Sequence, residues 1–254
     1  MNKIYSHLLQ EDTMRKLQVL KLEELIDLID EIGAEAKYAD LSFIDKVEQI
    51  LRRLYQAKLN QRIRVLRKNA KLRDKNAAIL NITYPKERCL SRELMVELST
   101  CNFMHGNTNI IFEGPTGAGK TYLACALGNA AMEKCFRCKY IRLPDLLQEY
   151  EEVKERHSVK NFIKKYVTPS LLILDEWLLR PISDEFCGKI LDIIDARYGE
   201  NSTIFCSQFP HSDWLERLGG TVAAEALIDR IIQNSLTVTL GDLNMRAEVN
   251  KRKF

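Results

Sequence analysis

The chain has 254 residues, with 38 Lys and Arg against 35 Asp and Glu, which gives a formal net charge of +3. This length can bury one α/β core with a smaller attachment, and the balanced total charge argues against a uniformly basic or acidic protein. The seven cysteines are an odd number, and neither a signal peptide nor an apolar run of about 18 residues occurs. We therefore expect a cytoplasmic protein with reduced thiols and no membrane partner.

Residues 1–80 are predicted to be helical and to form an N-terminal domain that binds a partner protein or DNA. Apolar residues recur at helical spacing through residues 14–32. The pattern restarts after Ser42, a candidate N-cap with Asp45 at the third helical position.

The continuation of this second helix carries a dense basic run. Residues 51–76 contain ten basic residues and one acid, Asp74, so this stretch carries +9 and the rest of the chain −6. Like charges along a helix repel, and a phosphate backbone would relieve the repulsion by counterion release. We predict sequence-tolerant contact with duplex DNA; the alternative is a solvated helix face. The candidate DNA contacts are Arg62, Arg64, Arg67, Lys68, Lys71 and Arg73.

Residues 81–100 are predicted to be a connector, because Tyr84-Pro85 interrupts the helical pattern. Strands and helices then alternate through a second domain, residues 101–254. The predicted strands are 109–113, 139–143, 170–175, 202–207 and 236–240, and the predicted helices are 120–134, 144–165, 184–198, 211–217 and 222–233. This order predicts an α/β fold with a five-stranded parallel sheet and helices on both faces.

Residues 114–121 match the phosphate-binding pattern G-x-x-x-x-G-K-[ST], between an apolar strand and an apolar helix. Its glycines permit a positive φ and close approach to a ligand, and the following helix N-terminus favours anions. Lys120 would neutralise the outer phosphates, and the Thr121 hydroxyl would ligate Mg²⁺. ATP and Mg²⁺ are the predicted cofactors, and the predicted nucleotide-binding residues are Gly114, Pro115, Thr116, Gly117, Ala118, Gly119, Lys120, Thr121 and Tyr122.

Two carboxylates follow the apolar run of residues 171–174. Because parallel strands end at the edge of the sheet that binds ligands, Asp175 is placed to hold Mg²⁺ through water. Glu176 is placed to orient or deprotonate a water that attacks the γ-phosphate. The alternative is a strand that merely ends in charged residues, and the upstream phosphate-binding motif favours the catalytic interpretation.

Three further side chains are candidates for catalysis. The strand 202–207 leads into Gln208, which we favour over Ser207 as the group near the γ-phosphate, because its amide both donates and accepts. Arg230 stands alone in an apolar helix, where it would pair with an acid or reach the ATP of a neighbouring subunit as an arginine finger. Arg246, after the last strand, is a second candidate.

These residues together resemble the AAA+ ATPases of the IstB/DnaC branch, with the closest match to IstB-like transposition helpers. The resemblance covers essentially the whole chain, including residues 41–43, 121–128, 197–198 and 202–204. It implies an AAA+ P-loop NTPase fold preceded by a small all-helical N-terminal domain, with no separate C-terminal lid. It also implies that residues 114–121 form Walker A and that Asp175 and Glu176 form Walker B.

The same resemblance implies roles for the remaining candidates. Gln208 would stand at or beside sensor 1, where Asn is more usual, Arg230 would be the arginine finger, and Arg246 would act like a sensor 2 arginine. Such proteins form ATP-dependent homo-oligomers on duplex DNA and stimulate a partner transposase, so DNA-stimulated ATP hydrolysis is expected. Trp177 departs from the small residue usual after the catalytic Glu, either as a packing substitution or as a change in how this loop meets DNA or a neighbour.

Other functions remain open at this stage. A DnaC-like helicase loader would use the N-terminal region to grip a helicase and would favour single-stranded DNA. A small-molecule kinase would need an acceptor pocket and a lid, and the basic run would then have no task. A nucleotide-gated scaffold that scarcely hydrolyses ATP is disfavoured by Glu176.

Overall fold

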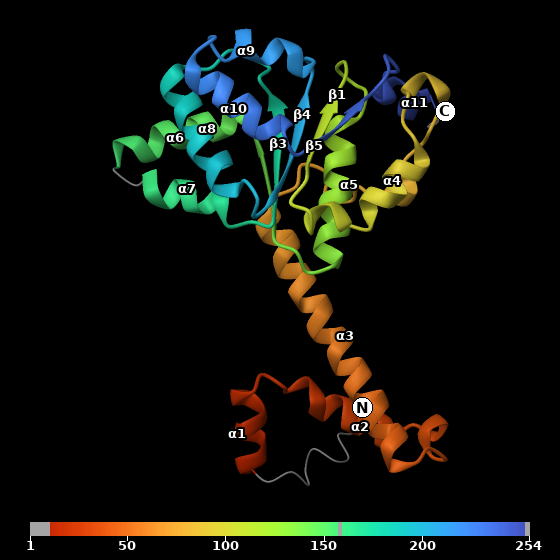
Figure 1. The fold of residues 1–254 in the computed structure, drawn as a ribbon. Helices are drawn as coiled ribbons and strands as arrows, with labels where there is room; N and C mark the ends of the chain where they lie inside the picture. Colours follow the sequence, from red (N-terminus) through yellow and green to blue (C-terminus); the bar gives the residue numbers. More distant parts are fainter. Residues whose placement is uncertain (1–10, 157–158, 252–254) are drawn as a thin grey trace. The chain divides into compact units, whose positions relative to one another are not determined.

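A computed structural model describes residues 11–156 and 159–251 of the chain (Figure 1). The chain divides into two compact units, one up to Arg64 and one from Val65 onward. Within the described residues, no helix combines the length and apolar character that crossing a bilayer requires.

The N-terminal unit is helical. It contains α1 (Glu11–Val19), α2 (Glu24–Ala34), a 3₁₀ turn η2 (Ala36–Tyr38) and the first part of α3 (Phe43–Ala70). The predicted cap of α3 is confirmed: the Asp45 N–H donates to Ser42 Oγ at 3.2 Å, and the Ser42 N–H donates to Asp45 Oδ2 at 3.3 Å. Such reciprocal bonds satisfy N–H groups that a helix start leaves without partners.

Helix α3 ends at Ala70, so the expectation of helix up to residue 80 is wrong for residues 71–78, and residues 79–80 belong to a short 3₁₀ turn. Lys71 has a left-handed backbone, with φ of 54°, and Ala70 and Leu72 on either side of it are buried. Burial of these two apolar side chains in the second unit fixes the chain after Ala70 in place of a further helical turn. The basic run is therefore not one continuous helix, and Lys71 and Arg73 lie beyond its end.

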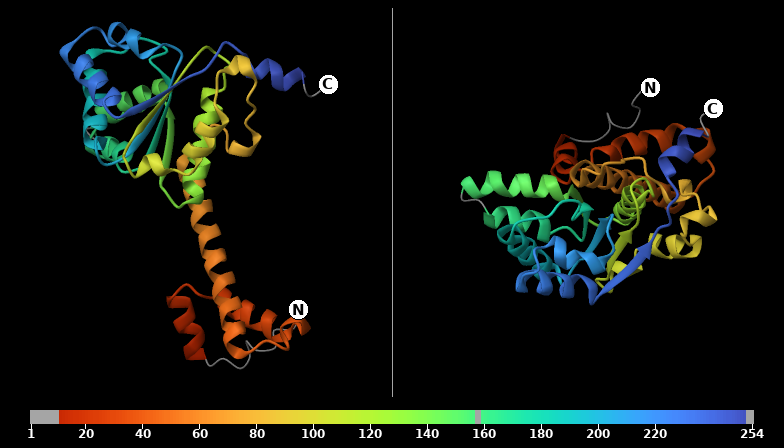
Figure 2. Two further views of the ribbon diagram at one scale, coloured as in Figure 1. Left: turned by 45° about the vertical axis from the view of Figure 1, so that its right-hand side comes forward. Right: turned by 90° about the horizontal axis from the view of Figure 1, so that it is seen from above.

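The second unit is built on a parallel sheet with the strand order β2-β3-β4-β1-β5 (Figures 1 and 2). The strands are β1 (Asn109–Glu113), β2 (Cys138–Arg142), β3 (Leu171–Trp177), β4 (Ser202–Ser207) and β5 (Ser235–Thr239). The predicted five-stranded α/β fold is thus confirmed. Register pairs Glu113 with Ser207 and Arg142 with Asp175, so the polar ends of four strands lie along one edge of the sheet.

Helices cover both faces of this sheet. They are α4 (Arg92–Ser99), α5 (Lys120–Glu133), α6 (Leu143–Glu155), α7 (Val159–Val167), α8 (Asp184–Arg197), α9 (Trp214–Arg217) and α10 (Val222–Ile232). A further helix, α11 (Met245–Lys251), follows β5. The single helix expected at 144–165 is two helices, α6 and α7. The other predicted elements of this domain agree with the structure to within one or two residues, apart from residues 211–213, which form a 3₁₀ turn before the short α9.

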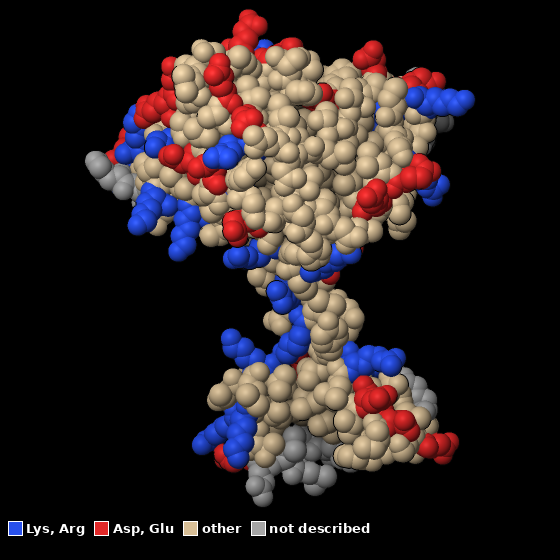
Figure 3. All heavy atoms as spheres, viewed as in Figure 1, with Lys and Arg blue, Asp and Glu red and all other residues tan. Residues whose placement is uncertain are grey.

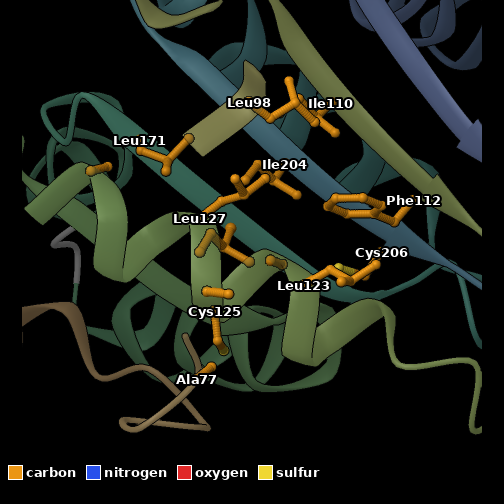
Figure 4. Close-up of a cluster of buried hydrophobic side chains, with 14 of the residues drawn as sticks. Ala77, Leu98, Ile110, Phe112, Leu123, Cys125, Leu127, Leu171, Ile204 and Cys206 are labelled. Atoms are coloured by element: carbon orange, nitrogen blue, oxygen red, sulfur yellow. The ribbon is translucent and has the colours of Figure 1, made fainter. Parts of the chain in front are cut away.

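Alternate side chains of the strands feed two separate cores, as a two-faced sheet requires. One core joins the sheet to α4 and α5 and contains Ile110, Phe112 and Leu127 (Figure 4). The other lies against α6–α10 and contains Ile111 and Phe205. With both faces covered, the strands read as continuous apolar runs, which is why the sequence located them well.

The segment between α3 and β1 packs on α5. Apart from α4 it is mostly irregular, with short 3₁₀ turns at Ile79–Asn81, Lys86–Arg88 and Asn102–Met104. The buried Asn129 amide on α5 donates to the Ala77 carbonyl at 2.8 Å. The C-terminal segment joins the same region, because the Gly241 N–H donates to the Arg88 carbonyl at 2.9 Å. The first segment is thereby held against α5, and the C-terminal segment is held against the first.

Candidate functional site

The loop between β1 and α5 has the backbone that its glycines were expected to allow. Gly114, Gly117 and Gly119 have φ of 143°, 90° and 92°. A Cβ on Gly117 would lie 2.5 Å from Asn244 Oδ1, and one on Gly119 would lie 2.7 Å from Arg88 Nη2. A larger residue at either position would have a strained backbone and would displace the neighbouring side chain. Glycine at both positions therefore leaves the loop backbone accessible to a ligand.

Lys120, the first residue of α5, is buried with 8% of its surface exposed. Its ammonium donates to the carbonyls of Gly114 and Pro115, at 2.5 and 2.8 Å. Burial lowers the pKa of this ammonium, because water no longer solvates the charge. A cation held by two neutral oxygens in a desolvated loop is suited to pair with an anionic phosphate.

Asp175, near the end of β3, lies at the centre of a hydrogen-bond network. Its Oδ2 accepts from Thr121 Oγ1 at 2.8 Å and from the Tyr140 hydroxyl at 2.7 Å, while its Oδ1 accepts from the Glu176 N–H at 2.9 Å. Burial, followed by the neighbouring carboxylate, raises the pKa of Tyr140, so this phenol remains a donor at neutral pH. The structure thus brings the two predicted metal-binding residues into direct contact.

These residues fit a Mg²⁺ that arrives with a nucleotide. Within residues 11–156 and 159–251, no group of three His, Cys, Asp or Glu side chains could hold a metal on its own. Mg²⁺ is commonly bound by one or two protein oxygens, with phosphates and water completing its six ligands. Thr121 and Asp175 supply that kind of incomplete site.

Glu176 has a left-handed backbone, with φ of 54°, and its side chain is 23% exposed. Two arginines face its carboxylate: Arg73 Nη1 lies 3.3 Å from Oε1, and Arg142 Nη1 lies 3.6 Å from Oε2. Burial opposes the charge of Arg73, but Tyr140 and the two carboxylates outweigh it and raise the pKa of the guanidinium. Arg73, predicted as a DNA contact, therefore lies against the predicted catalytic carboxylate.

Trp177 is fully buried, which favours the packing interpretation of this departure from the family pattern. Its ring packs edge-on against Phe205 and Trp214, with centroid separations of 4.9 and 5.7 Å. Trp177 also rejoins the ladder opposite Ser207 after an irregularity in β3. The chain bulges at Glu176 between two buried neighbours and turns that carboxylate away from the core.

The end of β4 separates the two sensor candidates. The Ser207 hydroxyl is buried and donates to the Phe209 carbonyl at 2.7 Å, so local structure uses it. Gln208 Oε1 accepts from Thr116 Oγ1 of the phosphate loop at 2.7 Å. Of the two, Gln208 is the one that lies at the loop.

One cavity of about 1010 Å³ joins these groups. It is lined by Thr116, Gly117, Gly119, Lys120, Thr121, Tyr122, Asp175, Glu176, Gln208 and Arg246, and also by residues of the 73–88 segment that the sequence did not indicate. This volume is at the upper end of what small-molecule ligands occupy in proteins. Among the unexpected residues are Asn81, Ile82, Thr83 and Arg88. Arg142 could have been found from its position at a strand end, whereas nothing in the sequence marks Arg88 or Tyr140.

Arg230 is the one catalytic candidate that does not line this cavity. It lies on α10, where its Nε donates to Asp195 Oδ1 at 2.8 Å and its guanidinium stacks over Tyr198 at 4.9 Å. Its side chain is 42% exposed. The carboxylate partner matches one of the two interpretations of Arg230, and the exposure leaves part of the guanidinium accessible from outside.

The candidate DNA contacts are exposed. Arg62 and Arg64 lie on α3 in the N-terminal unit, and basic side chains gather along this helix (Figure 3). In the second unit, Lys68 and Lys71 are exposed, and Arg67 pairs with Glu133 at 3.2 Å. Surface pairs of this kind contribute little to stability, so they leave the arginine available to another anion.

Residues 15–253 match the protein family described as IstB-like ATP binding protein. The chain is 30% identical over 239 residues to a Sinorhizobium fredii protein named as an insertion sequence ATP-binding protein, covering 94% of this chain and 96% of the relative. It is 29% identical over 205 residues to the ATP-binding protein of insertion sequence IS1162 from Pseudomonas fluorescens, covering 81% and 89%.

Solved structures share the fold of the second unit. The AMPPCP-bound DnaA of Aquifex aeolicus superposes with a TM-score of 0.58 at 23% identity, over 72% of this chain and 56% of that one. A DnaC helicase loader superposes with a TM-score of 0.57 at 20% identity, over 65% and 97%. At these identities the likeness shows a shared AAA+ fold.

Proposed function

Because the chain belongs to the family of IstB-like ATP-binding proteins, we propose that it is a DNA-stimulated ATPase that assists transposition. In this proposal it assembles on duplex DNA with ATP and Mg²⁺ in the cytoplasm. It then stimulates or targets the transposase of its insertion sequence. The insertion-sequence names of its relatives support this setting.

The observation that carries the proposal is the convergence of Lys120, Thr121 and Asp175 on one cavity. Lys120 pairs with the outer phosphates, and Thr121 and Asp175 hold Mg²⁺, which neutralises charge on the phosphates when bound. Glu176 orients the attacking water, and Gln208 lies beside the loop to contact the γ-phosphate. Each residue lies at the end of a strand or the start of a helix, where its position is fixed by the sheet.

Contact with duplex DNA is proposed for the basic run. Its charge of +9 over 26 residues is concentrated and mostly exposed, whereas the rest of the chain is acidic. Phosphate contacts of this kind release counterions and give binding that weakens steeply with salt. The helical N-terminal unit would also provide the surface that grips the transposase.

DNA stimulation has a physical route in the contact between Arg73 and Glu176. While Arg73 and Arg142 hold the two oxygens of its carboxylate, Glu176 is less available to orient an attacking water. A DNA phosphate that binds Arg73 would compete for the guanidinium. DNA binding would thereby release the Glu176 carboxylate to act on the attacking water.

Assembly into an oligomer is proposed from Arg230, which lies outside the cavity of its own chain and is partly exposed. Arg230→Ala and Lys120→Ala should each lose most ATPase activity, because one lacks the finger and the other lacks the phosphate-binding ammonium. An equal mixture of the two should regain activity if one subunit supplies Arg230 to the ATP of another. A mixture as inactive as either parent would contradict a shared site.

The proposal as a whole is tested by measuring ATP turnover with no DNA, with duplex DNA and with single-stranded DNA. We expect the duplex to give the largest stimulation, with an effect that fades between low and high salt. Electron microscopy with an ATP analogue should show oligomers that need the duplex. Stimulation by single strands alone, together with capture of a replicative helicase, would favour a helicase loader instead.

A further inference from the structure

Arg88 is a buried cation that the ATPase motifs do not include. It lies in the 3₁₀ turn Lys86–Arg88 and is 2% exposed. Of its five N–H donors, one donates to the Thr83 carbonyl at 2.7 Å. The buried Nε has no partner, and among the described residues no carboxylate pairs with the guanidinium. Burial lowers the pKa of Arg88, the expected sign of a charge that lacks a counter-ion.

The position of this guanidinium is fixed from several directions. Its Nη2 lies against the phosphate loop, 2.7 Å from the point where a Cβ on Gly119 would stand. The Arg88 carbonyl accepts from the Gly241 N–H at 2.9 Å, and the next residue, Cys89, has a left-handed backbone with φ of 53°. Arg88 also lines the same cavity as Lys120 and Thr121. The turn therefore holds the cation at the start of α5.

Arg197 shows what a purely structural buried arginine looks like in the same unit. It is 1% exposed and, within the part of the chain that the structure describes, it too has no carboxylate partner, but its guanidinium donates to five oxygens. These are Thr203 Oγ1 at 3.0 Å and the carbonyls of Tyr166 at 3.0 Å, Val167 at 3.1 Å, Pro169 at 2.7 Å and Ser202. Arg197 thus closes a carbonyl-lined niche, whereas Arg88 leaves most of its donors unused beside a cavity.

We propose that Arg88 is a phosphate-binding residue of the nucleotide site, which pairs its guanidinium with the phosphates of the nucleotide held in the loop. A desolvated guanidinium with free donors gains most from an anion with several acceptor oxygens, and phosphate matches the planar donors of arginine. Lys120 and Arg88 then bind the phosphate chain from two elements, α5 and the connector. The proposal rests on nucleotide binding by the loop, which Lys120→Ala tests separately.

The matched variants are Arg88→Met, which keeps the length of the side chain without its charge, and Arg197→Met. Replacing an uncompensated buried charge by an apolar group of similar size is neutral or stabilising, whereas removing a satisfied one leaves carbonyls without partners. In the nucleotide-free full-length protein, we expect Arg88→Met to melt at or above the wild-type temperature. We expect Arg197→Met to melt lower.

Nucleotide affinity is then measured by calorimetric titration of each variant with Mg²⁺ and ATP, and with ADP. We expect Arg88→Met to weaken ATP binding about 10- to 100-fold, the range for a lost hydrogen-bonded charge pair. Arg197→Met, measured where it is folded, should bind like the wild type. An ATP Kd for Arg88→Met within twofold of the wild-type value would overturn the proposal.

Two further measurements keep the outcomes distinct. If Arg88→Met does not fold, Arg88→Gln replaces it, because its neutral amide can still donate to a carbonyl, and a wild-type ATP Kd for it would equally overturn the proposal. Inorganic pyrophosphate should raise the melting temperature of the wild type more than that of the variant. Failure of the wild type itself to bind ATP would instead refute the proposed function.

Discussion

The cavity of the ATPase unit has two walls that are built differently. The motif wall consists of residues 116–117, 119–122, 175–176 and 208 and is made of the phosphate loop, strand ends and the start of α5. The connector wall consists of residues 73–76, 81–83, 88, 245–246 and 248 and is made of irregular chain and short helices. The pairing of the strands fixes the positions of the residues in the motif wall. Hydrogen bonds from side chains to the backbone and packing on α5 fix the residues of the connector wall. The difference suggests that the motif wall carries the chemistry and the connector wall adjusts it.

The strongest test of the motif wall is Lys120→Ala. Because the buried ammonium is the loop's own cation toward phosphate, its loss should weaken ATP binding by roughly 10²-fold or more. Nucleotide titration by calorimetry measures this, with Arg197→Lys as a control for a buried cation elsewhere. Near-normal ATP affinity in Lys120→Ala would show that the connector wall, and not the motif wall, supplies most of the phosphate binding.

The next test is Glu176→Gln, which keeps the shape of the side chain and removes its basicity. Turnover should fall about 10²- to 10³-fold, as for other general bases, while ATP affinity stays within about threefold of wild type. Single-turnover hydrolysis and equilibrium binding on the same sample separate the two quantities. An unchanged turnover would show that another group activates the water.

The smallest effect is expected at the boundary between the two walls, in Arg73→Gln. Removing one of the two cations that hold Glu176 should raise turnover without DNA by about two- to fivefold, since a partly exposed pair is worth up to ~1 kcal/mol. The same variant should lose much of its stimulation by duplex DNA. The matched control is Lys68→Gln, because Lys68 is basic and exposed but does not line the cavity. This variant should leave turnover without DNA unchanged. Equal turnover without DNA in the wild type and in Arg73→Gln would show that Arg73 does not restrain Glu176. DNA could then not activate the enzyme through this contact.

The motif wall follows closely from the sequence, and the connector wall does not. The strands 109–113 and 202–207 were predicted with their observed bounds, because buried parallel strands are unbroken apolar runs between polar residues. Parallel strands end at one edge, so the order of the motifs along the chain is enough to place Asp175 beside Thr121. These inferences need only local patterns and one topological rule.

The connector wall depends on contacts between distant residues, which no local pattern encodes. No glycine or proline marks the end of α3 at Ala70; burial of Ala70 and Leu72 ends it. Arg88 follows a proline in a stretch that reads as a simple linker, and its burial depends on Gly119 and Gly241, which lie 31 and 153 positions later. Arg73 was predicted from charge density alone, which does not reveal that it reaches Glu176.

The packing of Trp177 limits which motions could activate Glu176, and therefore how fast activation could be. Anchored in an aromatic cluster and in the ladder, Trp177 prevents the main chain at Glu176 from moving without unpacking the second core. Any activation of Glu176 must therefore occur through side-chain motion, above all of the half-exposed Arg73 that faces it, and exposed side chains change rotamer in picoseconds to nanoseconds. The rate of activation would then be limited by how fast an anion reaches the arginines that face Glu176, because no refolding step is required.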